Sequence, residues 1–350
     1  MPKILMKGNE AIAESALRAG CTHYFGYPIT PQTELSEYLA REMPKRKDCF
    51  FMQAESEVAA INMVLGAASA GARVMTSSSS PGISLKQEGI SYIAGCNLPC
   101  VIVNMVRGGP GLGNIAPSQG DYFQATKGGG HGDYRLIVLA PNSVQELADL
   151  TVEAFDLADK YRMPVMVLGD GLMGQMMESV EFSKSSENDL SRKPWTTRGA
   201  RGRKPNIINS LYLEPEELEK ENLKSLQKYR EVEKNEKRIE LFEMADAEYA
   251  IVAFGIVSRI AKSVVKEARE KGMKAGLIRP VTLWPFPSEE IARQAEKVKS
   301  FLVAELNMGQ MVEDVRLAVN GRKPVHFIGR LGGMLLTPQQ LMEKLEEVAK

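Results

Sequence analysis

The chain has 350 residues, of which 44 are Lys or Arg and 44 are Asp or Glu, so its formal net charge is zero. A balanced charge argues against a nucleic-acid binder or a polybasic membrane binder, because both need a surplus of positive charge. The sequence has no apolar run of the roughly 20 residues that a membrane helix needs, no evident signal peptide, and four scattered cysteines that suggest no disulfide framework. We therefore expect a cytoplasmic protein of two or three domains.

Short β-branched and aromatic runs alternate with helical patterns along the first 180 residues. Between Val144 and Ala158, for example, apolar residues recur at i, i+3, i+4 and i+7. Such alternation is typical of a parallel α/β sheet with helices on both faces. The six predicted strands are Thr22–Tyr27, Cys49–Gln53, Arg73–Ser77, Cys100–Val106, Leu136–Ala140 and Pro164–Leu168.

The middle of the chain has a different composition. Residues 183–205 are rich in Ser, Arg, Lys, Gly and Asn and predict a linker. Residues 214–243 carry dense mixed charge with spaced leucines, which predicts one or two exposed amphipathic helices. We therefore predict a linker and charged helical arm over 181–244, which either is a solvated connection or binds a partner.

A second α/β block follows over residues 245–350, after an αβ domain over 1–180. It begins with a strand at Tyr249–Phe254 and ends with Thr337-Pro338, a helix N-cap followed by Pro at the first helical position. The predicted elements between these points are helices Val257–Lys271, Ser288–Lys297 and Gln310–Val319 and strands Ala275–Arg279, Ser300–Ala304 and Pro324–Ile328. The predicted fold class is thus α/β, with two parallel-sheet αβ domains.

Polar and glycine-rich segments follow four successive strands of the first domain. Ligands bind outside the carboxyl ends of strands in open parallel sheets, so these segments are candidates for one shared site. They are residues 27–33 (YPITPQT), 54–57 (AESE), 78–82 (SSSPG) and 107–113 (RGGPGLG).

Thr30 and Glu57 each have a structural and a functional interpretation. Thr30 is suited to cap a helix with Pro31 at its first position, and a helix N-terminus also attracts carboxylates. Glu57 opens a segment of small apolar residues that predicts a helix buried almost all round, where an unpaired carboxylate is costly. It either follows the preference for acids at helix starts or is a functional acid. Glu55 is expected to point elsewhere, into solvent.

Arg107 ends an apolar strand and enters a glycine-rich loop. Its guanidinium suits recognition of a carboxylate or phosphate, or else makes a surface ion pair. The spacing Gly109-x-Gly111-x-Gly113 resembles part of a dinucleotide loop, but the residues from Pro117 do not open the helix that such a site requires.

Three further patterns predict no metal site in this chain. Gly169-Asp170-Gly171 suggests a magnesium-diphosphate motif but has no Asn at the expected distance, so we interpret it as unrelated. Cys96 and Cys100 lack the further cysteines that an iron–sulfur cluster needs and are expected to be core thiols. The three histidines are scattered.

Several of these segments resemble the 2-oxoacid:ferredoxin oxidoreductases, and in particular the alpha subunit of the multi-subunit form. The resemblance is carried by YPITP at 27–31, MQAESE at 52–57, RGGPG at 107–111 and SQGD at 118–121. It implies a thiamin diphosphate pyrimidine-binding domain followed by a domain similar to the transketolase C-terminal domain.

The resemblance also implies roles for the residues identified above. Thiamin diphosphate lies between two subunits in this family, so Glu57 would hydrogen-bond the pyrimidine N1′ and promote its imino tautomer; its spacing to Gly66 matches the family helix. Thr30 and Arg107 would bind the substrate, with Thr30 also taking a catalytic part. The neighbouring cofactor-binding residues would be Tyr27, Pro28 and Ile29.

The implied activity is oxidative decarboxylation of a 2-oxoacid with coenzyme A to acyl-CoA and CO2, with electrons passing to ferredoxin. Magnesium and iron–sulfur clusters would belong to partner chains: a beta subunit, a gamma subunit and a ferredoxin-like delta subunit. The apolar Gly111-Leu112-Gly113 favours a branched-chain substrate such as 2-oxoisovalerate over 2-oxoglutarate. Two alternatives are a non-catalytic scaffold of the same fold and a self-sufficient thiamin decarboxylase, which would need a diphosphate motif in this chain.

Overall fold

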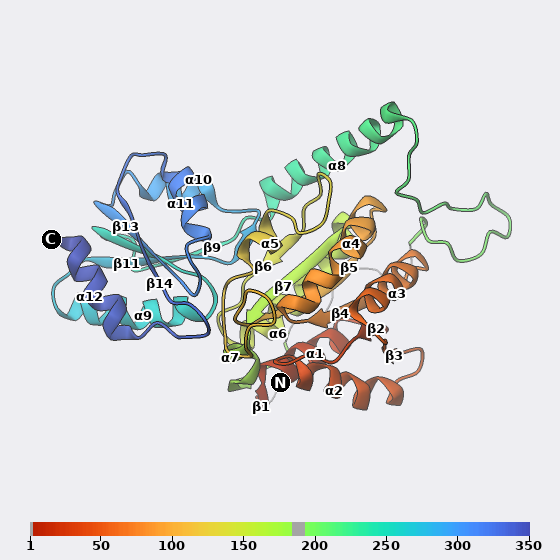
Figure 1. Cartoon of the computed structure of the whole chain (residues 1–350), viewed down its shortest axis with the longest axis horizontal. Coiled ribbons are helices and arrows are strands. Elements are labelled where there is room, and N and C mark those ends of the chain that lie inside the picture. The colour runs from red at the N-terminus through yellow and green to blue at the C-terminus, as the bar shows by residue number, and fades with distance from the viewer. Residues whose placement is uncertain (1–2, 184–192) are drawn as a thin grey trace.

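The computed structural model describes residues 3–183 and 193–350. A seven-stranded sheet and a five-stranded sheet, each flanked by helices, form the two halves of the molecule (Figure 1). This arrangement confirms the predicted α/β class with two sheet domains. No helix within the described ranges is long and apolar enough to span a membrane.

The seven-stranded sheet has the order β12-β6-β7-β5-β4-β2-β3 and contains all six strands predicted in the first domain. They pair in parallel, and β12, from the second half of the chain, joins the edge antiparallel to β6. The bounds are β2 (His23–Gly26), β3 (Phe50–Gln53), β4 (Val74–Ser78), β5 (Cys100–Val106), β6 (Ile137–Leu139), β7 (Pro164–Asp170) and β12 (Thr282–Trp284).

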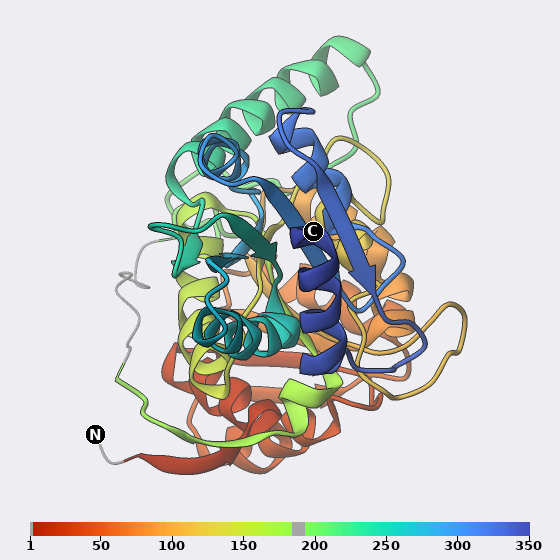
Figure 2. The same cartoon turned by 90° about the vertical axis from the view of Figure 1, so that its left-hand side faces the viewer.

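Helices cover both faces of this sheet because the connections run in both directions from its centre. α3 packs on α4, while α1 packs on α2 and α6 (Figures 1 and 2). The helices are α1 (Gly8–Arg18), α2 (Thr33–Glu42), the 3-10 helix η1 (Met43–Lys45), α3 (Glu57–Ser69), α4 (Ser80–Gly95), α5 (Tyr122–Thr126), α6 (Val144–Tyr161) and α7 (Gly171–Gln175).

The five-stranded sheet has the order β14-β13-β10-β11-β9, in which β9 alone is antiparallel to its neighbour. Thr337 caps the last helix through Gln340 N–H, as predicted. The elements are β9 (Ile239–Phe242), β10 (Tyr249–Val252), α9 (Gly255–Glu270), β11 (Ala275–Pro280), α10 (Ser288–Gln294), β13 (Ser300–Glu305), α11 (Met311–Val319), β14 (Val325–Gly329) and α12 (Pro338–Ala349).

Short edge strands were not anticipated from the sequence. β1 (Ile4–Lys7) and β8 (Met177–Val180) pair with each other as an antiparallel ribbon, and β9 lies within the residues assigned to the arm. Each has four residues, too few for a clear alternation of apolar and polar side chains. The division of the chain into domains at 180 and 244 stays a prediction.

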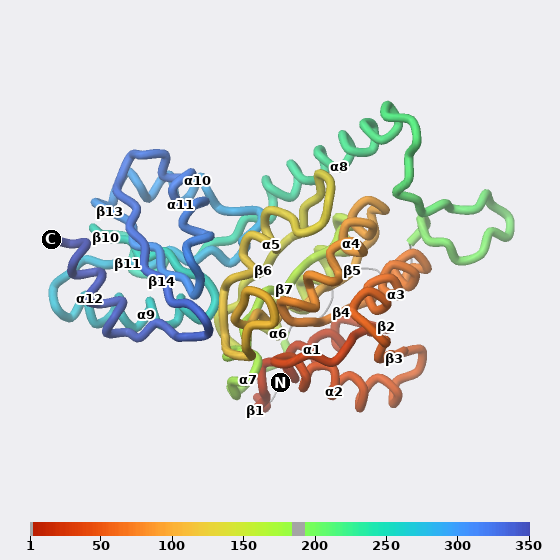
Figure 3. The backbone as a smooth tube through the Cα atoms, viewed as in Figure 1, coloured from red at the N-terminus to blue at the C-terminus, as the bar shows by residue number. Residues whose placement is uncertain are grey.

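The charged segment forms one long helix, α8 (Pro215–Asn235). The backbone trace shows the chain from residue 193 extending away from the sheets and returning through α8 (Figure 3). Tyr229 and Val232 are its buried residues, so only the C-terminal part of α8 packs firmly on the body. Residues 184–192 of the predicted linker lie outside the described residues.

Arg279 ties the two halves together. It lies on β11 and is almost fully buried, and its guanidinium donates two hydrogen bonds, of 2.8 and 2.9 Å, to the Glu146 carboxylate on α6. A third bond, of 2.6 Å, reaches Glu240 on β9. Bidentate geometry and burial make this ion pair stronger than a surface pair.

We expect Arg279→Met to lower the free energy of unfolding by about 3 kcal/mol, because two carboxylates lose a buried cation. The matched control is Lys299→Met, which removes an exposed partner of Glu248 and should cost less than about 1 kcal/mol. Urea unfolding of the full chain measures both, and equal losses would contradict a special role for Arg279.

Candidate functional site

Four strand ends meet at one edge of the seven-stranded sheet. β5, β4, β2 and β3 are consecutive neighbours, and all run in parallel. Their carboxyl ends therefore deliver the four polar and glycine-rich segments to one edge, as the sequence predicted. The structure thus supports one shared candidate site.

Glu57 is the first residue of α3. Ser56 caps the helix by accepting a 3.1 Å hydrogen bond from Ala59 N–H, which places Glu57 at the helix start. Its side chain is 6% exposed, whereas Glu55 is exposed, as expected. The carboxylate lies against Gly82 at the start of α4, where an added Cβ would be 2.7 Å from Glu57 Oε1.

Glu57 and the buried hydroxyl of Ser78, which has no partner among the described residues, both pack against Gly82. Among residues 3–183 and 193–350, no hydrogen bond or ion pair to the Glu57 side chain is found, and Ser78 Oγ and Ser79 Oγ are buried without partners. Buried polar groups without partners cost free energy. The absence of a Cβ at residue 82 lets the Glu57 carboxylate and Ser78 Oγ pack directly against the start of α4. These groups keep hydrogen-bonding capacity that the described residues do not use.

One face of α3 is exposed, so the prediction of a helix buried almost all round is wrong. Val58, Asn62 and Gly66 follow one another at i, i+4 and i+8, and all three are exposed. An added Cβ at Gly66 would meet nothing within 4 Å. The described part of the chain supplies no element that covers this face, although its residues are mostly small and apolar.

Thr30 does not cap a helix, and that prediction is also wrong. α2 begins at Thr33 with Gln32 at its N-cap position. The Pro31 carbonyl instead accepts a 2.8 Å hydrogen bond from Asn9 Nδ2 on α1. This tertiary contact holds residues 29–32 in a turn and leaves Thr30 exposed at the sheet edge.

Arg107 joins Thr30 to the glycine-rich loop. Its Nη1 donates to the Thr30 carbonyl and its Nη2 to the Leu112 carbonyl, both at 3.0 Å. The side chain is 8% exposed, and its Nε is buried without a partner. No carboxylate in the described ranges pairs with Arg107, which disfavours the surface ion pair and leaves capacity for an anion.

Sequence reasoning missed Lys86, which is fully buried on α4. Its Nζ donates 2.6 Å to Thr76 Oγ1 and 3.2 Å to the Ser77 carbonyl. Burial lowers the Lys86 pKa to about 7, and the charge of Glu57 opposes that shift. A signal was present in the sequence, because Lys86 falls on the apolar helix face between Ile83 and Ile90.

The patterns interpreted as unrelated have structural roles here. Asp170 Oδ1 accepts hydrogen bonds from Leu172 and Met173 N–H at the start of α7, and burial raises its pKa to about 6. Cys100 is buried, and Cys96 is partly buried; both are free thiols. Within the described ranges, no three His, Cys, Asp or Glu side chains cluster to hold a metal.

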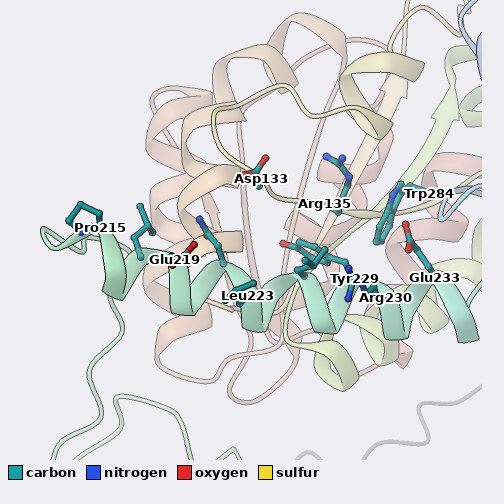
Figure 4. Close-up of a pocket in the computed structure, with 12 residues that line it drawn as sticks. Asp133, Arg135, Pro215, Glu219, Leu223, Tyr229, Arg230, Glu233 and Trp284 are labelled. Atoms are coloured by element: carbon teal, nitrogen blue, oxygen red, sulfur yellow. The ribbon is translucent and has the colours of Figure 1, made fainter.

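A groove of about 590 Å3 lies between α8 and the body (Figure 4). Leu218, Leu223 and Tyr229 of α8 line it together with Trp284 and Arg135 of the body. Arg135 precedes β6, so the groove lies near the amino end of the sheet's strands, opposite the edge that carries Glu57. It is therefore separate from the candidate site.

The chain matches two family profiles along most of its length. Residues 14–244 match "Pyruvate flavodoxin/ferredoxin oxidoreductase, thiamine diP-bdg", and residues 247–341 match "Pyruvate:ferredoxin oxidoreductase core domain II". It is 51% identical to ketoisovalerate oxidoreductase subunit VorB of Methanothermobacter marburgensis, over 99% of this chain and 97% of that one. It is 37% identical to 2-oxoglutarate synthase subunit KorA of Methanocaldococcus jannaschii, over 96% and 97%.

Two solved structures are similar. The 2-oxoglutarate:ferredoxin oxidoreductase from Magnetococcus marinus, with 2-oxoglutarate, coenzyme A and succinyl-CoA bound, has a TM-score of 0.89 and 28% identity. The match covers 100% of this chain and 66% of that longer one. A split-gene transketolase has a TM-score of 0.58 at 13% identity, which supports the fold alone.

Gly82 makes the position of Glu57 testable. A Cβ at residue 82 would lie 2.1 Å from Ser78 Oγ and 2.7 Å from Glu57 Oε1. We expect Gly82→Ala to destabilise the chain by about 1–3 kcal/mol through overpacking, whereas Gly66→Ala should stabilise it by up to about 1 kcal/mol. Urea unfolding measures both, and a neutral Gly82→Ala would contradict the close approach.

Proposed function

The chain belongs to the pyruvate flavodoxin/ferredoxin oxidoreductase family as a subunit of a 2-oxoacid:ferredoxin oxidoreductase, and we propose that its own substrate is a branched-chain 2-oxoacid such as 2-oxoisovalerate. In this proposal the complex cleaves CO2 from the 2-oxoacid, transfers the acyl group to coenzyme A and passes two electrons to ferredoxin.

The observation that carries the proposal is the environment of Glu57. An acid with no hydrogen-bonding partner in the described chain lies in a buried corner beside Gly82 and the unpartnered hydroxyl of Ser78. In a scaffold that binds no cofactor, burying this carboxylate without a partner would lower stability with no functional gain. We propose that Glu57 hydrogen-bonds the pyrimidine N1′ of thiamin diphosphate, with Tyr27, Pro28 and Ile29 lining the same cofactor site.

When bound, thiamin diphosphate supplies the electron sink for loss of CO2 from the substrate. In this proposal the protein orients the 2-oxoacid substrate and binds its negatively charged carboxylate. Arg107 is proposed to bind the 2-oxoacid carboxylate through its guanidinium, since its Nε lacks a partner and its Nη atoms hold only loop carbonyls. The hydroxyl of exposed Thr30, whose carbonyl Arg107 binds, is proposed to contact the substrate beside its keto group.

We propose that a partner subunit completes this site and holds the magnesium, the diphosphate and the iron–sulfur clusters. The surface around Glu57 supports a protein contact, because it exposes apolar side chains that this chain does not cover, among them Leu85, which is 54% exposed. The others are Tyr27, Met52 and Val58. In the proposed assembly the partner is a beta subunit, accompanied by a gamma subunit and a ferredoxin-like delta subunit.

The preference for a branched-chain substrate is supported by the loop that Arg107 holds. Leu112 is 83% exposed, and Ile115 is also exposed, so this loop presents apolar side chains next to the proposed carboxylate site. A 2-oxoglutarate site would need a second cation for the distal carboxylate. The higher identity to the ketoisovalerate subunit, 51% against 37% for the 2-oxoglutarate subunit, points the same way.

Replacing Glu57 tests the cofactor assignment. In the complex assembled with its partner chains, Glu57→Gln should lower turnover by roughly 10²–10⁴-fold, because it removes a positioned acid–base group. Glu55→Gln is the matched control and should keep most of the activity, since Glu55 is exposed. Reduction of a low-potential dye measures turnover. Equal losses in both variants would refute the assignment, and a wild-type assembled complex that binds no thiamin diphosphate would favour the scaffold.

Arg107 and the substrate are tested together on a panel of 2-oxoacids. The wild-type complex should prefer 2-oxoisovalerate over 2-oxoglutarate and pyruvate in kcat/KM. Arg107→Lys keeps the charge but loses the planar fork, so KM should rise for every accepted 2-oxoacid by about tenfold, the equivalent of about 1.4 kcal/mol. A selective rise in KM for coenzyme A, with unchanged values for 2-oxoacids, would show that Arg107 contacts coenzyme A instead.

A further inference from the structure

A second cavity, of about 580 Å3, lies between the charged arm and the first sheet domain. Asn97 and Arg162 line it just before the amino ends of β5 and β7, and Lys228 lines it from α8. Its volume falls in the range of small-molecule binding sites, which is about 300–1,000 Å3. The cavity is at the opposite end of the strands from Glu57, and none of its lining residues has a part in the proposed chemistry.

Asn97 holds two cations together at this cavity. Lys228 Nζ donates a 2.6 Å hydrogen bond to Asn97 Oδ1, and Arg162 Nε donates a 3.1 Å bond to the Asn97 carbonyl. Lys228 Nζ also donates to the Arg162 carbonyl at 3.3 Å. The Arg162 guanidinium lies over the ring of Trp195, 4.5 Å from its centroid. These contacts fix an ammonium and a guanidinium side by side at the cavity.

Neither cation has an anionic partner: among residues 3–183 and 193–350, no carboxylate bonds Arg162 or Lys228. Glu221, the acid of the lining, pairs with Lys224, so the lining carries three cations and one acid. Burial and, to a lesser extent, the positive charge of Arg162 lower the pKa of Lys228 to about 8. Two half-buried cations held in one place cost free energy, which a bound anion would offset.

A purely structural role accounts for Lys228 only in part. Arg162 is the C-cap residue of α6, and a lysine that donates to the last carbonyls of a helix interacts favourably with the helix dipole. The Arg162 guanidinium, however, donates only through Nε, and its Nη groups have no hydrogen-bond partner within the described ranges. An arginine that lines a cavity with both Nη groups unused is suited to bind an oxyanion.

We propose that this cavity binds the phosphate group of a small phosphorylated molecule of up to nucleotide size. A phosphate has enough acceptor oxygens to bond the Arg162 guanidinium and the Lys228 ammonium at once, and the planar fork of arginine matches its geometry. The cavity has room beyond the phosphate, where Ile208 and Tyr212 add apolar and aromatic lining. Because one cation comes from α6 and the other from α8, the ligand would also join the arm to the body.

The test titrates adenosine monophosphate, inorganic phosphate and adenosine into the assembled complex by isothermal titration calorimetry, at about pH 7 and constant ionic strength. Both phosphate probes should bind, and adenosine should bind about tenfold more weakly than the monophosphate, or less. Lys228→Gln and Arg162→Gln should each weaken binding of the monophosphate by about tenfold, because each removes a charge-assisted contact. Lys234→Met is the matched control: it removes one positive charge from an exposed position of α8 that does not line the cavity, and should bind as the wild type does.

The pH dependence of binding gives a second readout. The Lys228 ammonium loses its proton around pH 8, whereas a phosphate monoester is a dianion above about pH 6, so wild-type affinity should fall between about pH 7 and pH 8.5. Lys228→Arg keeps its charge over this range, as Arg162 does, and should give a flatter profile. Burial raises the pKa of the other lining groups that lose a proton in alkali, the Cys96 thiol and the Tyr161 and Tyr212 phenols.

Several results would overturn this inference. They are no binding of either phosphate probe to the wild-type complex, equal affinity for adenosine and its monophosphate, and wild-type affinity in both glutamine variants. An equal loss in Lys234→Met would also overturn it, because binding would then follow the net charge rather than this cavity. If Lys228→Gln detaches α8 from the body, Arg162→Gln still decides, since the Arg162 side chain bonds Asn97 and not α8.

Discussion

The burial of one carboxylate at the contact between α3 and α4 constrains the site more than any other feature. Glu57 is held at the first turn of α3 by the Ser56 cap, and the glycine at 82 allows α4 to pass within contact distance of its oxygen. Ser78 Oγ at the end of β4 and Ser79 Oγ at the N-cap of α4 are buried without partners among the described residues, and the Ser78 hydroxyl packs against the same glycine as Glu57.

The sheet brings other candidate site residues to the same edge as Glu57. Parallel pairing of β3, β2, β4 and β5 sends their carboxyl ends to one edge, so Thr30, Glu57 and Arg107 lie on segments of the same edge despite wide separation in sequence, and Arg107 bonds the Thr30 carbonyl there. The second sheet is joined to this edge by the loop that follows Arg107. Gln119 on that loop exchanges hydrogen bonds with Leu306 and donates to the Phe254 carbonyl.

Exposed apolar side chains and the groove beside α8 lie at opposite ends of the strands of the first sheet. Tyr27, Met52 and Val58 are exposed on the segments that follow or end the parallel strands, whereas α8 leaves its groove near the amino ends of the strands. The groove of α8 and the segments that carry Glu57 therefore lie at opposite ends of the strands. The bidentate pair of Arg279 with Glu146 keeps the two sheets together near α6.

The sequence by itself determined the α/β class, the six strands of the first sheet, the long charged helix and the family, because these depend on local periodicity and short motifs. It also identified Glu57 as an acid in an apolar segment. Three features were decided only by the tertiary structure. Asn9 bonds the Pro31 carbonyl, so α2 begins after Pro31; β12 joins the first sheet; and one face of α3 stays uncovered by the described residues. Lys86 shows the reason: a lysine among apolar residues has no visible partner in sequence, since Thr76 and the Ser77 carbonyl reach it only when α4 packs on β4.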